Sequence, residues 1–73
     1  MSRWVLDTVR LADAVETVRR HRGVTAKVIA SEMGLSDSTL TRLKQGHKPD
    51  ADGLVSVLAW LNADAREFTR ETP

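Results

Sequence analysis

The stretch that decides the fold covers Gly34–Gly46 and has the sequence G-L-S-D-S-T-L-T-R-L-K-Q-G. Ser36 is a good helix N-cap, because its hydroxyl can accept a hydrogen bond from a backbone N–H of the first turn. At about 100° per residue, Leu40 and Leu43 share one face of the helix that follows. We therefore predict a short helix over about residues 36–45, with its leucines turned toward a core.

The opposite face of this short helix is polar. It carries Ser38, Thr41, Arg42 and Gln45, with Asp37 in the exposed first turn. Short hydroxyl side chains at the front of a helix let that end approach another surface closely. The major groove of B-DNA is about 12 Å wide, accepts one α-helix, and presents hydrogen-bond donors and acceptors that these side chains can match.

A second short helix precedes the first. Thr25 can cap the segment A-K-V-I-A-S-E-M at 26–33, in which Ile29, Ala30 and Met33 share a face. Gly34 can take the positive φ that ends such a helix. The connection is so short that we expect the two helices to contact each other.

Helices are also predicted on both sides of this pair. Leu11, Val15 and Val18 recur with helical spacing up to Gly23, and the helix starts at either of two caps, Asp7 or Ser2. The later start would carry the helix cap at Asp7, and the earlier one would include Trp4 in the helix. We favour the longer helix.

Two helices are expected downstream. Asp50 can cap a helix whose apolar stripe is Leu54, Val57, Leu58 and Leu61, and Asn62 suits its C-terminal cap. The segment D-A-R-E, at 64–67, has the spacing of a capping box that opens a last short helix with Phe68 inward. No strand-like alternation is evident. We predict an all-α, five-helix single domain over 1–73, with an N-terminal extension at 1–10 and a frayed tail at 71–73.

Charge is distributed unevenly along the 73 residues, although the formal net charge is only +1. Segment 19–48 has a balance of +5, whereas both flanks are acidic. Such asymmetry suggests a polyanionic partner, although a solvated basic face would look the same. The cations of the segment are Arg19, Arg20, Arg22, Lys27, Arg42, Lys44 and Lys48.

Composition excludes several classes of protein. There is no Cys, so disulfides and thiolate metal sites are excluded, and His21 and His47 lack partners at metal-ligand spacing. No apolar run approaches the roughly 20 residues of a membrane span, and the first residues carry charges too early for a signal peptide. We expect a cytoplasmic protein without metal, cofactor or small-molecule ligand.

The ordered pattern resembles the phage-repressor and Cro type of helix-turn-helix protein, the lambda-repressor-like or XRE family. The resemblance covers about residues 11–68 through V-T-A-K-V-I-A-S-E-M-G-L-S-D-S-T-L-T-R-L-K-Q-G and Pro49 before the next helix. It implies a five-helix bundle in which the second and third helices form the DNA-binding unit and the third lies in the major groove. It also implies a Cro-like transcriptional repressor that binds double-stranded DNA, at a palindromic operator, as a homodimer.

The same resemblance assigns roles on the third helix. Asp37, Ser38, Thr41 and Arg42 are the candidates for base contacts. Arg42 could donate two hydrogen bonds to guanine, or instead contact a phosphate or form a salt bridge with Asp37 or another acidic residue. Asp37 could accept from cytosine, or only stabilise the helix dipole.

Phosphate contacts are expected from helix N-termini and from cations beside the groove. The candidates are Thr25, Ala26, Lys27, Ser36, Lys44, Gln45, His47 and Lys48. Ala26 is a departure, because many relatives carry glutamine there to clamp a phosphate. Arg19, Arg20 and Arg22 are more often solvated at such a helix end.

Trp4 and Trp60 admit two interpretations. The rings could pack against each other in an enlarged core, or they could lie in a homodimer interface. Function also admits an alternative, a protein-interaction module such as an antitoxin or anti-regulator. An enzyme is not expected, because no nucleophile–base pair, metal cluster or phosphate loop is present.

Overall fold

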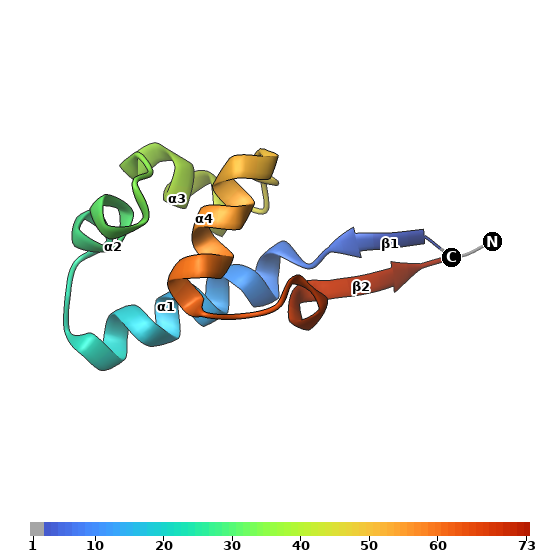
Figure 1. Cartoon of the computed structure of the whole chain (residues 1–73), viewed down its shortest axis with the longest axis horizontal. Coiled ribbons are helices and arrows are strands. Elements are labelled where there is room, and N and C mark those ends of the chain that lie inside the picture. Colours follow the sequence, from blue (N-terminus) through green and yellow to red (C-terminus); the bar gives the residue numbers. More distant parts are fainter. Residues whose placement is uncertain (1–2) are drawn as a thin grey trace.

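The structure is a computed structural model, and it describes residues 3–73. Four α-helices form the body, and a short two-stranded antiparallel ribbon extends from it (Figure 1). The elements in chain order are β1 (Arg3–Leu6), α1 (Thr8–Arg22), α2 (Ala26–Met33), α3 (Asp37–Lys44), α4 (Ala51–Leu61), a 3-10 helix η1 (Ala65–Phe68) and β2 (Thr69–Thr72).

The predicted N-caps of α2, α3 and α4 are confirmed. Thr25 accepts a hydrogen bond from the backbone of Val28, and Asp50 does the same for Gly53. Asp7 caps α1, so the later of the two predicted starts is correct and the preferred longer helix is wrong. Gly34 takes a φ of 73° after α2, which confirms its predicted role at the helix end.

The five-helix prediction is wrong at both ends of the chain. The capping box of Asp64 and Glu67 is present, but it opens a single 3-10 turn instead of an α-helix. The residues predicted to fray belong in part to β2, and Trp4 lies in a strand instead of a helix. The domain is therefore mostly helical with a terminal sheet.

The ribbon joins the two ends of the chain. Val5 pairs with Arg70 and Leu6 with Thr69, so that β1 and β2 run antiparallel. The backbone N–H of Asp7 donates to the carbonyl of Phe68 at 2.6 Å and continues the pairing to the start of α1. Because the partners are more than sixty residues apart, no local periodicity could indicate this sheet.

The core lies where the four helices and η1 meet. Leu11, Ile29 and Val57 are fully buried, and Phe68 of η1 is buried with them. Leu6, at the end of β1, packs against this cluster and anchors the ribbon to the body. Leu35, in the connection between α2 and α3, also packs against it.

Candidate nucleic-acid interface

Helix α3 is held by two leucines. Ser36 accepts a hydrogen bond from the backbone N–H of Thr39 and so fixes the start of the helix. Leu40 and Leu43 are only 3% and 2% exposed, which confirms the predicted inward face. Burial of two large apolar side chains on an eight-residue helix leaves little freedom in its rotation.

The four predicted base-contacting residues are all exposed on α3. They are Asp37, Ser38, Thr41 and Arg42. The helix is amphipathic, so its buried leucines and these polar side chains lie on different sides. The rotation of α3 therefore makes a polar surface available for contact with a partner.

Local hydrogen bonds limit what the hydroxyl groups can do. Thr41 Oγ1 donates to the carbonyl of Asp37 at 3.0 Å, which leaves the Thr41 oxygen as an acceptor. Ser36 Oγ lies 3.0 Å from Ser38 Oγ and 2.9 Å from Thr39 Oγ1. The hydroxyls at the front of α3 are thus pre-oriented by one another, and Thr41 is suited to accept from an amino group.

Arg42 has no ion-pair partner among residues 3–73, so the predicted alternative of a pair with Asp37 does not occur here. Its side chain borders a shallow hollow of about 280 Å³, shared with Leu35, Thr39 and Asp50. No acidic side chain within residues 3–73 forms an ion pair with its guanidinium group.

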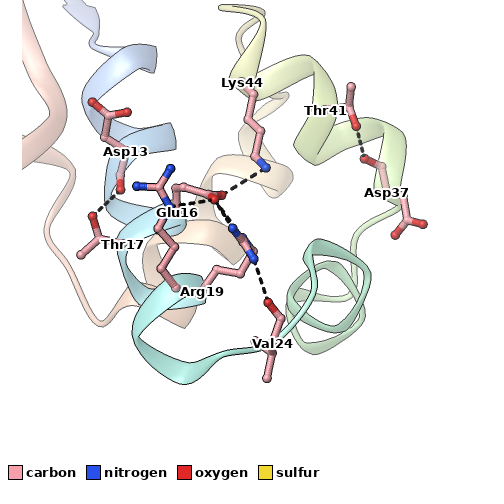
Figure 2. A network of polar contacts seen from close by, with 9 residues as sticks. Asp13, Glu16, Thr17, Arg19, Val24, Asp37, Thr41 and Lys44 are labelled. Carbon is pink, nitrogen blue, oxygen red and sulfur yellow. Dashed lines mark hydrogen bonds and ion pairs between the residues drawn. The ribbon is translucent and has the colours of Figure 1, made fainter.

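Lys44 has a different environment from Arg42. Its Nζ lies 3.2 Å from Glu16 Oε2 of α1, a charge contact that lacks the geometry of a well-directed hydrogen bond. Figure 2 shows Lys44 directed toward α1, while the contact between Thr41 and Asp37 lies on another side of α3. Lys44, predicted to bind phosphate, thus also links α3 to α1.

Glu16 is the centre of this network. Arg19 Nε donates to Glu16 Oε1 at 2.9 Å, and a second Arg19 nitrogen donates to the same oxygen. Arg19 also donates to the carbonyl of Val24 at 3.0 Å, beyond the end of α1 (Figure 2). The hydrogen bond from Arg19, followed by the contact from Lys44, lowers the pKa of Glu16 to about 2.

A second acidic residue, Glu32 of α2, connects three helices. Arg22 donates to its two oxygens at 2.6 and 2.8 Å, and Trp60 Nε1 donates at 3.0 Å. The hydrogen bond from Arg22, with that from Trp60 second, lowers the pKa of Glu32 to about 2. Trp60 is therefore engaged within the chain, by α2 and not by Trp4, which lies on the ribbon.

Neither acidic residue was singled out from the sequence. The i,i+3 spacing of Glu16 and Arg19 was available as a local signal. The sequence gives no local signal for the contact of Glu16 with Lys44 or for that of Glu32 with Trp60, because each joins residues 28 positions apart. These two networks fix α2 and α3 against the rest of the body. Arg19 and Arg22, expected to be solvated, and Lys44, expected to contact phosphate, form ion pairs within the chain.

We expect the free energy of unfolding to fall as the pH is lowered from about 4.5 to about 2. Glu16 and Glu32 have folded-state pKa values of about 2, below the ordinary 4.5, so their contribution is fully present above pH 4.5 and is lost below it. Urea unfolding followed by tryptophan fluorescence measures this loss. Glu32→Gln should flatten the dependence, whereas Asp13→Asn, at an exposed carboxylate of α1, should not. Equal slopes in both variants would contradict the assignment.

The remaining predicted phosphate contacts lie in three places. Thr25 is the N-cap of α2 and is exposed, while Ala26 and Lys27 begin the helix, Ala26 half-buried and Lys27 exposed. Ser36 and Gln45 cap the two ends of α3. His47 and Lys48 are exposed in the connector before α4, where the N–H of His47 donates to the carbonyl of Arg42.

A metal site, a ligand pocket and a membrane span each have requirements with which residues 3–73 can be compared. Residues 3–73 contain no group of three His, Cys, Asp or Glu side chains that could hold a metal ion. A hollow of about 460 Å³ is bordered by Trp4 and Thr69 of the ribbon and by Arg66 of η1, and it does not involve α3. No helix within the described residues has the length and apolar character needed to cross a membrane.

Comparisons with protein-family models, with curated proteins and with solved structures find no match to this chain.

Proposed function

We propose that this domain binds double-stranded DNA with sequence specificity, and that α2 and α3 act as a helix-turn-helix with α3 in the major groove. The observation that carries the proposal is the exposed polar side of α3, in which Arg42 has no ion-pair partner within residues 3–73. Because Leu40 and Leu43 are buried, this side cannot turn inward.

Arg42 would provide the principal base contact. A guanidinium can donate two hydrogen bonds to O6 and N7 of guanine, and such a contact contributes about 1–3 kcal/mol of discrimination between bases. Ser38 and Thr41 would add contacts, with the Thr41 oxygen accepting because its hydrogen is used within the helix. In this arrangement Asp37 stabilises the N-terminus of α3 or accepts from cytosine.

The contacts to the DNA backbone would come from the first turn of α2 and from Lys48. The backbone N–H groups at a helix N-terminus and nearby cations hold phosphates in position without discriminating bases. Lys44 would contribute less than its position in the sequence indicates, because Glu16 already neutralises part of its charge. Of the cations in residues 19–48, Lys27, Arg42 and Lys48 have no ion-pair partner within residues 3–73, which agrees with a polyanionic partner.

The proposed biological role is that of a small Cro-like transcriptional repressor that binds a palindromic operator as a homodimer. Selection of bound sites from a randomised duplex pool tests it. A consensus with two symmetric half-sites is expected, and the spacing of the half-sites reports how two subunits bind. Absence of any DNA binding at low salt would contradict the proposal and favour the alternative of a protein-interaction module.

We expect Lys48→Ala to weaken binding to all duplex sequences by a similar factor. Loss of one phosphate contact should lower the slope of log K against log salt by about one, while the consensus stays the same. Fluorescence anisotropy at several salt concentrations measures both quantities. Arg70→Ala is the matched control, because Arg70 is an exposed cation of β2 outside the proposed interface. Equal slopes for the two variants would exclude Lys48 from the interface.

A further inference from the structure

The ribbon of β1 and β2 makes few contacts with the rest of the molecule. It projects beyond the helical body, so that only its base contacts the core (Figure 1). An isolated two-stranded ribbon is marginally stable in water. Trp4, in the projecting part, is 66% exposed, which is unusual for a tryptophan outside a binding surface.

The hydrogen-bond pattern shows which backbone groups of β1 point away from β2. Asp7 donates to Phe68, so this pair belongs to the hydrogen-bonded set of the antiparallel ladder. The set alternates along the strands, so Arg3 and Val5 also direct their backbone groups toward β2. The N–H and C=O groups of Trp4 and Leu6 therefore point outward, along an edge that no other strand within residues 3–73 covers.

We propose that this edge of β1 pairs with β1 of a second copy of the chain, in a symmetric antiparallel register centred on Val5. Trp4 then lies opposite the partner's Leu6, and each pair of these residues exchanges the backbone hydrogen bonds that the edge offers. The two copies of Val5 meet on the twofold axis as a non-hydrogen-bonded pair. The product is a continuous four-stranded sheet in the order β2, β1, β1, β2.

The side chains agree with this register. The same register sets Arg3 opposite the partner's Asp7, so that on one face of the sheet two pairs of opposite charge flank the two Val5 side chains. Trp4 and Leu6 lie on the other face. Directly opposite residues of an antiparallel pair share a face and interact. The exposed ring of Trp4 gains an apolar neighbour, the partner's Leu6, and loses much of its contact with water.

The edge of β2 is unsuitable for the same pairing. A symmetric antiparallel pair must be centred on one residue, and the centre of β2 is either Arg70 or Glu71. Either choice sets two like charges directly opposite each other, which is destabilising. Charge thus selects β1 over β2 as the edge that a second copy covers.

A cross-linking experiment tests this register on the free protein. Because the chain contains no Cys, Val5→Cys introduces a single thiol at the twofold axis. Non-hydrogen-bonded partners have Cα atoms about 4.5 Å apart, within the range of a disulfide. Arg70→Cys is the matched control, since Arg70 pairs with Val5 but lies on the outer strand. In the four-stranded sheet its two copies are about three strand spacings of ~4.8 Å apart, too far to be bridged.

Under mild oxidation we expect Val5→Cys to form a covalent dimer rapidly and Arg70→Cys only slowly, although Arg70 is the more exposed position. Sedimentation of the unmodified chain should show a dimer in the micromolar range, and Trp4→Glu should lose it while keeping the helical circular dichroism. A monomeric chain at these concentrations, or faster cross-linking of Arg70→Cys, would overturn the proposal. The proposed function invokes a dimer as well, but no DNA is present in these measurements, so the two proposals fail independently.

Discussion

Leu40→Ala is expected to lower the free energy of unfolding by about 2–5 kcal/mol, because it leaves a cavity beneath α3 in place of a side chain that is only 3% exposed. A domain of this size has a total stability on the order of 4–11 kcal/mol. The substitution therefore removes a large part of the stability, and it should lower the midpoint of thermal unfolding by about 10 °C or more. Urea and thermal unfolding followed by circular dichroism measure both effects.

The control for this prediction is Thr41→Ala, one residue further along the same helix. Thr41 is exposed, and substitutions at exposed positions usually change stability by no more than about 0.5 kcal/mol. A comparable loss in the two variants would show that α3 does not pack through Leu40. In that case the polar side of the helix could not be the surface described above.

Arg42→Ala is expected to abolish the preference for one base pair in the selected consensus, with a loss of about 1–3 kcal/mol of discrimination at that position. Because the arginine has no acidic partner among residues 3–73, its removal should leave the stability of the domain nearly unchanged. Site selection with the variant, together with measured affinities for single-base variants of the operator, provides the test.

Arg42→Lys separates the two roles that an arginine can have here. Lysine keeps the positive charge but lacks the planar fork that donates two parallel hydrogen bonds. If Arg42 contacts a base, Arg42→Lys should lose most of the discrimination while the salt dependence is retained. An unchanged consensus in Arg42→Ala, with a uniform loss of affinity, would instead identify Arg42 as a phosphate contact.

The features that sequence reasoning predicted correctly are local ones. Thr25, Ser36 and Asp50 cap helices through hydrogen bonds to backbone groups three residues further on. The inward direction of Leu40 and Leu43 follows from helical spacing alone. Interactions of this kind are made by neighbouring residues in almost any fold, so the chain order is enough to indicate them.

The predictions that are wrong concern residues whose contacts are with residues far away in the sequence. Trp4 was assigned to a helix and the tail was expected to fray, because neither four-residue strand has a periodicity of its own. Their pairing depends on Leu6 and Phe68, which bring the two ends of the chain together at the core. In the same way, the distance between Lys44 and Glu16 depends on how α3 packs on α1.

Hydrogen bonds within a turn and the burial of a helical stripe are set by residues a few positions apart. The order of residues therefore indicated the four α-helices, the N-caps of α2, α3 and α4, and the polar side of α3. Two features became evident only from the folded arrangement: the ribbon formed by β1 and β2, and the ion pair of Lys44, which Arg42 lacks within residues 3–73. Both outcomes depend on distances between residues far apart in the chain. Such distances are fixed by the packing of the whole core.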